Sequence, residues 1–144
     1  MTDLSCDFDF TQNYNIDEMH MHFALLLSKQ EHQNRVIDYT KKERNLEISN
    51  NVFSLLLAKD THELIDIGKI MSICVGSYAY RVIENHCTIM ILRSNDAPVG
   101  CVELRGGAVV QVKGPYNKLL QGSERAFIMK WVEVKGLAVT TKDL

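Results

Sequence analysis

The sequence predicts an α+β fold, in which an antiparallel sheet, a three- to four-stranded meander, is flanked by a long N-terminal helix, two short helices and a C-terminal helix. Three runs rich in β-forming residues follow one another at 87–93, 99–105 and 108–113, an order typical of a meander. Apolar residues at helical spacing precede and follow these runs. This order of elements indicates helices packed around an antiparallel sheet.

The chain has the length and composition of one globular domain. It has 144 residues, of which 46% are hydrophobic and 24% charged, enough to bury a core without disulfides or a metal. The net charge of -2 gives no overall attraction to phosphate. The four cysteines are too far apart for a C-x-x-C metal site, so we expect reduced thiols in a cytoplasmic protein with no metal or cofactor. The apolar stretches are too short to span a bilayer, so no membrane partner is expected.

The N-terminal region is acidic and then helical in its pattern. The first 28 residues contain no lysine or arginine, and residues 1–16 are interpreted as an acidic, flexible arm. From Asp17 onward, apolar residues follow helical spacing, and the pattern resumes at Val36 and Ile37. One long helix over about 17–43 is therefore predicted.

The middle of the chain carries strand signals and then helix signals. Residues 46–58 are rich in apolar and β-branched side chains and contain Asn50, which predicts a strand or a short hairpin. Asp60 and Glu63 have the spacing of a capping box, and Gly68 fits a helix stop. A short helix is predicted between them.

A second short helix is predicted over 76–85, before the meander. Within the meander, Gly106 and Gly107 supply the positive φ angles of a two-residue hairpin turn. Asn95 and Asp96 mark the preceding turn. Both hairpins are therefore antiparallel.

The last helix is predicted from a cap and an apolar stripe. Ser123 is the expected N-cap, Phe127 and Trp131 lie on one face, and Gly136 ends the helix. No internal repeat or linker indicates a second domain. The whole chain, 1–144, is read as one domain with three parts: the arm at 1–16, a helix plus strand at 17–58, and a core at 60–135.

Residues 74–82 carry a motif, Cys-Val-Gly-Ser-Tyr-Ala-Tyr-Arg-Val, that resembles the PcfJ-like family. In that family a Cys-Val-Gly-Ser-Tyr run precedes an arginine and then a β-meander. Many members have a histidine just before the cysteine, where this chain has Ile73. The resemblance covers about residues 60–135. The later landmarks, in the expected order, are Leu92, Arg93, Cys101, Val102, Glu103, Leu104, Gln111, Val112, Lys113, Gly114, Asn117 and Trp131.

The resemblance implies a biological setting for the protein but no chemical reaction. The family is associated with conjugative plasmids, prophages and related mobile elements, and it has no settled chemistry. The change to Ile73 removes the histidine that a Cys/His pair would use. The resemblance therefore implies a protein of a phage or plasmid.

Cys74 is a weak candidate nucleophile. It stands just before a predicted helix, where the helix dipole lowers the pKa of a thiol and favours the thiolate. The competing interpretation is a small buried hydrophobe between Ile73 and Val75, and free cysteine is among the most buried residue types. No catalytic residue is assigned.

Polar residues around the motif and the meander are candidate binding residues. Backbone N–H groups of Gly76 and Ser77, with Arg81 one turn later, have the form of an anion site. The alternatives are a tight helix entry and a structural ion pair between Arg81 and Glu103. The full set near the meander is Gly76, Ser77, Tyr78, Arg81, Glu103, Gln111, Lys113 and Asn117.

The acidic arm suggests a second binding surface. Asp3, Asp7 and Asp9 alternate with Phe8 and Phe10, so the arm has the chemistry to occupy a phosphate-binding groove on another protein. The alternative is a disordered tail. A mild basic surplus after residue 105 weakly supports contact with nucleic acid, but a solvated face is the simpler interpretation.

Two classes of function remain. The first is a non-enzymatic, protein-binding accessory factor of a mobile genetic element, acting on a bacterial host or mobile-element protein, for example an anti-CRISPR protein that inhibits a defence nuclease. The alternative is a DNA-processing or cysteine-dependent enzyme or adaptor in conjugation, with Cys74 as nucleophile and Arg81 or Lys113 holding an anion. The absence of nucleotide, metal and triad motifs in the sequence favours the first class.

Overall fold

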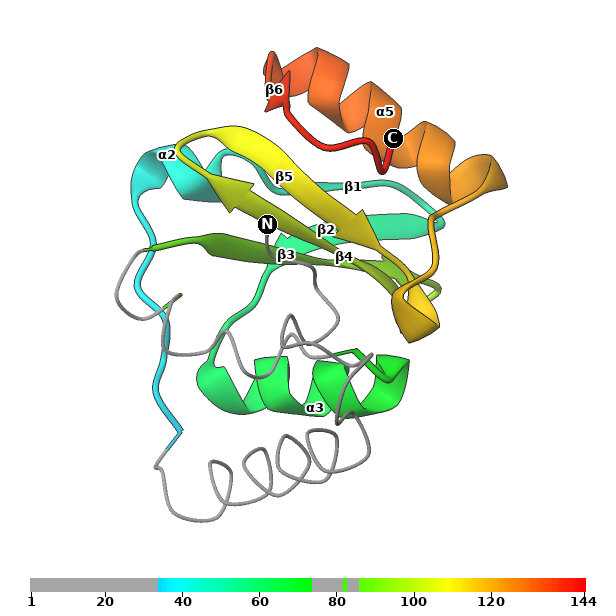
Figure 1. Ribbon diagram of the computed structural model, residues 1–144. Coiled ribbons are helices and arrows are strands. Elements are labelled where there is room, and N and C mark those ends of the chain that lie inside the picture. The colour runs from blue at the N-terminus through cyan, green and yellow to red at the C-terminus, as the bar shows by residue number, and fades with distance from the viewer. Residues whose placement is uncertain (1–33, 74–81, 83–85) are drawn as a thin grey trace, which may run out of the picture.

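The computed structural model describes residues 34–73, 82 and 86–144, which form a curled, mixed sheet shaped like half of a barrel (Figure 1). Helix α3 (Thr61–Met71) packs on one face of the sheet and helix α5 (Gly122–Lys135) on the other. The short helices are α2 (Lys41–Arg44) and the 3-10 turn η2 (Pro115–Asn117). The strands, in order across the sheet, are β1 (Ile48–Ser49), β2 (Phe53–Leu57), β3 (Thr88–Ser94), β4 (Ala97–Arg105), β5 (Ala108–Lys113) and β6 (Ala138–Val139).

The predicted meander is present but forms only the centre of the sheet, so the predicted three- to four-stranded architecture is wrong. Strands β3, β4 and β5 pair antiparallel through turns at Asn95-Asp96 and Gly106-Gly107, all four with positive φ. The region 46–58 folds as a hairpin, which adds β1 and β2. Strand β6 then pairs parallel with β5 and makes the sheet mixed.

The long helix predicted over 17–43 is also wrong: in its described part only the residues of the separate short helix α2 are helical. Residues 34–40 are not helical: Val36 bridges Asp60, and the Ile37 N–H donates to the Lys59 carbonyl oxygen at 3.0 Å. Val36 is exposed and Ile37 is buried, the alternation of extended chain rather than of a helix. The remainder of that prediction lies outside the described residues.

Helices α3 and α5 form close to their predicted positions, but some of their end residues differ from the prediction. Helix α3 is capped by Asp60, whose side chain accepts from the Glu63 N–H at 2.8 Å. It continues past Gly68 and ends at Ser72, whose φ is 55°. Helix α5 begins after Gln121 rather than at Ser123 and ends at Gly136 as predicted. The helix predicted over 76–85 lies outside the described residues except for Val82, which is helical and buried.

The sheet separates two hydrophobic cores. On one face, Leu64 and Met71 of α3 pack with Ile89 and Cys101. On the other, Trp131 of α5 packs with residues of β2 to β5. The described residues contain no helix that is both long and apolar enough to cross a bilayer.

Candidate functional site

The candidate site begins with a polar pair on the α3 side of the meander. Strand β4 alternates its side chains, so Glu103 shares a face with Cys101 of the α3-side core. Glu103 pairs with Gln111 on β5, at the last position before a register shift in this strand pair. Two buried polar side chains therefore lie opposite each other on neighbouring strands.

Glu103 is fully buried and takes part in an ion pair. Its exposed fraction is 0%, and Oε2 accepts from Arg105 Nε at 2.6 Å. Arg105 is itself exposed, so its charge reaches the carboxylate from the surface. A buried carboxylate is tolerated only with such a partner, so this pair has a structural role at least.

Gln111 is the least satisfied polar group of the described chain. It is 4% exposed, and neither its amide nitrogen nor its amide oxygen has a hydrogen-bond partner among the described residues. A buried polar group without a partner costs about 1–3 kcal/mol. Its position opposite Glu103 makes the pair a feature that packing alone does not explain.

Lys113 lies two residues further along β5 and is held by the C-terminal segment. Its Nζ lies 3.1 Å from Asp143 Oδ1, and the other carboxylate oxygen accepts from the Val112 N–H at 2.9 Å. Both charged side chains are only 13% exposed. The cation predicted to hold an anion thus already contacts a carboxylate of this chain.

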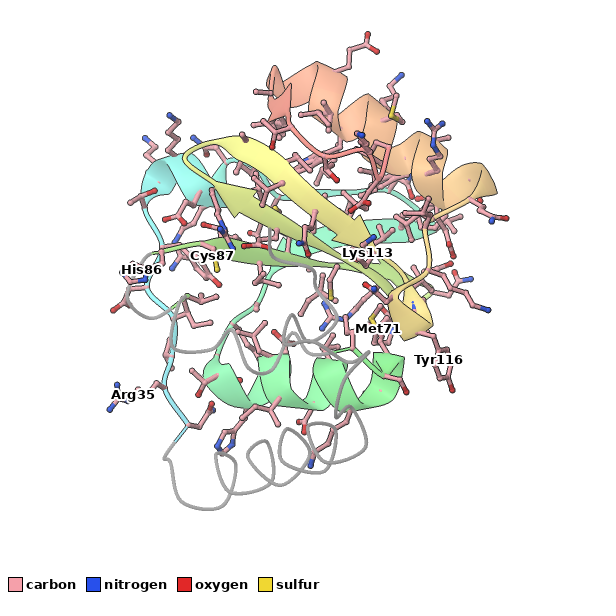
Figure 2. The ribbon with its side chains drawn as sticks, viewed as in Figure 1. Arg35, Met71, His86, Cys87, Lys113 and Tyr116 are labelled. Atoms are coloured by element: carbon pink, nitrogen blue, oxygen red, sulfur yellow. The ribbon has the colours of Figure 1, made fainter. Side chains whose placement is uncertain are left out.

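The turn after β5 presents an aromatic side chain. Tyr116 and Asn117 both have positive φ, 57° and 62°, and the turn is closed by a 2.6 Å bond from the Gly114 N–H to the Lys118 carbonyl oxygen. The Tyr116 side chain is 71% exposed. Figure 2 shows it beyond Lys113 at the end of β5, near Met71 of α3.

Gly114 fits closely into this turn. A Cβ at Gly114 would lie 3.3 Å from the Lys118 carbonyl oxygen, so a larger residue would require a small shift of that backbone. The sequence signal was present, because a Gly-Pro-x-Asn run is typical of a turn. Asn117 is among the residues predicted from the sequence, whereas the exposure of Tyr116 depends on the tertiary fold.

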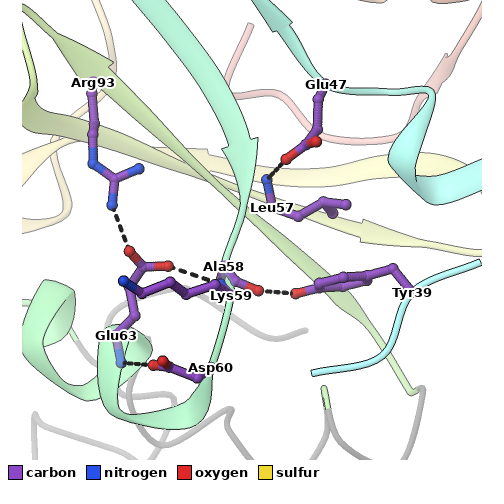
Figure 3. A network of polar contacts seen from close by, with 8 residues as sticks. All are labelled: Tyr39, Glu47, Leu57, Ala58, Lys59, Asp60, Glu63 and Arg93. Carbon is purple, nitrogen blue, oxygen red and sulfur yellow. Dashed lines mark hydrogen bonds and ion pairs between the residues drawn. The ribbon is translucent and has the colours of Figure 1, made fainter. Parts of the chain in front are cut away.

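A polar network joins the start of α3 to the sheet (Figure 3). Glu63 Oε2 lies 2.9 Å from Arg93 Nη2, and its other oxygen accepts from the Lys59 N–H at 2.8 Å. The Tyr39 hydroxyl donates to the Ala58 carbonyl oxygen. These contacts fix α3 against β3, and Arg93 therefore has a structural partner.

The two described cysteines are buried rather than presented on a surface. Cys87 and Cys101 are free and buried, and burial raises the pKa of the Cys101 thiol to about 12, against a smaller opposing effect of the Arg93 charge. A thiol with so high a pKa is not ionised near neutral pH. Within the described residues, no three His, Cys, Asp or Glu side chains are grouped to hold a metal ion.

The structure thus brings part of the predicted site together. Glu103, Gln111 and Lys113 lie on two adjacent strands, and Asn117 lies in the turn that follows; their role in binding stays a prediction. The other predicted site residues lie outside the described residues and are Asp3, Asp7, Asp9, Cys74, Gly76, Ser77, Tyr78 and Arg81.

The fold and site define a small α+β protein with a curled mixed sheet, a buried polar pair and an exposed aromatic turn. A family model described as PcfJ-like protein matches residues 10–128. The chain belongs to the PcfJ-like family. This range is wider than the 60–135 expected from the motif and includes most of the N-terminal region. Neither the curated proteins nor the solved structures contain a match.

Proposed function

We propose that this protein is a non-enzymatic, protein-binding accessory factor of a mobile genetic element, carried by a phage or plasmid. An inhibitor of a host defence nuclease, such as an anti-CRISPR protein, is the concrete form of this proposal. Membership of the PcfJ-like family supports this proposal, since the family is associated with conjugative plasmids, prophages and related mobile elements. The exposed Tyr116 turn carries the argument for protein binding.

The Tyr116 turn has the properties of a protein-binding hot spot. Tyrosine is enriched among the residues that dominate interface energies, and this one is held in place by the closed turn at Gly114 and Lys118. A side chain displayed on a rigid turn loses little entropy on binding. Leu119, shortly after the turn, is also an exposed apolar residue.

The described charged groups near the turn fit recognition better than catalysis. Glu103 is paired with Arg105 and Lys113 with Asp143, so each is already engaged within the fold. The two described cysteines are buried. These groups therefore support a stable binding scaffold around the Tyr116 turn.

The test is affinity capture from the bacterial host, with and without nuclease treatment. We expect tagged wild-type protein to retain a host or mobile-element protein after nuclease treatment, and Tyr116→Ala to retain much less. Val134→Ala is the matched control, because Val134 is also exposed but lies at the far end of α5. If the retained protein is a nuclease, its activity should fall with the wild type and not with Tyr116→Ala.

Two outcomes contradict the proposal. Retention that disappears on nuclease treatment points to nucleic-acid binding and to the DNA-processing alternative. Equal retention by the wild type and Tyr116→Ala shows that the Tyr116 turn is not the binding surface.

A further inference from the structure

The outer edge of β5 is covered by the C-terminal segment 138–143, called here the strap. Strand β6 pairs with only two residues of β5, at Ala108 and Val109. One more backbone bond follows, from the Thr140 N–H to the Val109 carbonyl oxygen at 3.0 Å. Further along the edge, a side chain rather than a strand satisfies the Val112 N–H.

That side chain is the carboxylate of Asp143, and its surroundings form a carboxylate site. One oxygen accepts from the Val112 N–H at 2.9 Å, and the other lies 3.1 Å from Lys113 Nζ. A backbone donor and a cation converge on one group, and both charged side chains are largely shielded from water. Such charge-assisted hydrogen bonds favour an acidic group over any other.

The strap pairs with the sheet at fewer backbone positions than strands β2 to β5 pair with one another. Its two strand residues, Ala138 and Val139, are exposed and pair at two positions, whereas neighbouring strands from β2 to β5 pair at five to seven positions. It also lies outside the range 10–128 that matches the family model. Unpaired strand edges are templates for added strands, and peptide recognition by an edge strand is common.

We infer that the edge of β5 is a docking site for an extended segment of a partner protein that carries an acidic side chain, and that the strap occupies this site when the partner is absent. The partner's backbone replaces the pairing of β6, and its Asp or Glu replaces the carboxylate of Asp143 between Val112 and Lys113. The edge leads directly to the Tyr116 turn, so both contact one partner. The inference rests on the proposed protein-binding function and names the partner's chemistry.

The experiment uses the full chain and a fluorescent peptide with the sequence of residues 137–144. The peptide is titrated into the wild type, Asp143→Ala and the control Lys142→Ala, an exposed neighbour in the strap. Because the wild-type site is already occupied, its apparent affinity is reduced by the fraction of open molecules. We expect Asp143→Ala to bind the peptide about tenfold more tightly than the wild type or Lys142→Ala.

Specificity for the acidic group is tested in the same assay. A peptide with Asn in place of its Asp should bind the Asp143→Ala variant much more weakly. Adding Lys113→Gln to that variant should remove its increased affinity for the original peptide. Thr141→Ala provides a second way to loosen the strap, because it removes the 3.1 Å bond from the Asp143 N–H to the Thr141 hydroxyl and keeps every charge. Amide exchange at Val112 should quicken in both loosened variants.

The inference is overturned if Asp143→Ala binds the peptide no better than the wild type, or if the Asn peptide binds equally well. Unchanged exchange at Val112 in both loosened variants would also overturn it, since the strap would not be what protects the edge. The peptide assay involves no cellular partner. Its failure therefore leaves the outcome of affinity capture with Tyr116→Ala intact, and the two proposals fail separately.

Discussion

Trp131 Nε1 donates a hydrogen bond of 2.7 Å to the carbonyl oxygen of Leu46. The two residues are 85 positions apart, and the bond connects α5 to the segment that leads into β1. The Trp131 side chain is fully buried within the α5-side core. One side chain therefore combines core packing with the satisfaction of a distant backbone carbonyl.

Trp131→Phe should lower the free energy of unfolding by about 2 kcal/mol, because the smaller ring leaves a cavity and the hydrogen bond from the indole N–H to the Leu46 carbonyl oxygen is lost. Urea denaturation of the wild type and the variant measures the difference. Met129→Ala, an exposed change on the same helix, should stay within about 0.5 kcal/mol. Equal stability of Trp131→Phe and the wild type would contradict the structural role of this contact.

Gln111→Met should raise the free energy of unfolding by about 1 kcal/mol, because it replaces a buried amide that has no partner among the described residues with an apolar side chain of similar shape. Gln111→Glu is the opposite control. It places a second carboxylate across from Glu103 and should destabilise the fold. A loss of stability in Gln111→Met would mean that the amide has a stabilising partner in solution.

The sequence predicted the parts of the fold that local chemistry determines. The turn at Gly106-Gly107 follows from backbone preference alone, and Asp60 caps α3 by a bond to its own helix. The short strand β6 and the extended segment around Val36 form only through distant partners on β5 and at Asp60. No local pattern of apolar residues distinguishes such segments from a helix or a loop.

The candidate site divides in the same way. Glu103 and Gln111 were identified from the family landmarks, and their opposition follows from the hairpin between β4 and β5. The strap at Asp143 and the exposure of Tyr116 were missed, because each depends on how the chain after β5 returns to the sheet. The sequence pattern does not predict the path by which the chain after β5 packs back on the sheet.

The stability of the protein should depend on the ionisation of Glu43 in acid. Burial raises the pKa of this carboxyl, but hydrogen bonds from the Thr40 backbone N–H, the Thr88 hydroxyl and the Thr40 hydroxyl outweigh it and hold the pKa below the ordinary value of 4.5. The charged form therefore stabilises the fold at pH values above 4.5. This contribution is lost as the pH falls through the folded-state pKa.

Thr88→Val removes one of these bonds, of 2.7 Å between the Thr88 hydroxyl and Glu43 Oε2. At neutral pH it should cost about 1 kcal/mol of stability, since the carboxylate is only partly buried. The difference from the wild type should shrink below about pH 4, and NMR titration should show a higher pKa for Glu43. A difference that does not change with pH would contradict this account.

Cys101 should resist alkylation in the folded protein. Burial raises the pKa of this thiol from the ordinary 9.0 to about 12, so at pH 8 much less of it is the reactive thiolate than in an exposed cysteine. Iodoacetamide labelling with peptide mapping by mass spectrometry measures the rate at Cys101 itself. The same site should label at an ordinary rate in denaturant, and rapid labelling of the folded protein would refute its burial.

Tyr116→Asn should make the protein more stable and a poorer binder at once. Tyr116 has a φ of 57°, a left-handed conformation that costs a non-glycine residue energy and that asparagine tolerates better. Since the side chain is exposed, its loss removes little packing, and we expect a gain of about 0.5–1 kcal/mol in urea denaturation. Tyr116→Ala is the matched control, because it also removes the aromatic ring but lacks the short polar side chain that lets asparagine tolerate the left-handed conformation. It should therefore lose partner capture without gaining stability, whereas equal stability of Asn and Ala variants would show that the turn is unstrained.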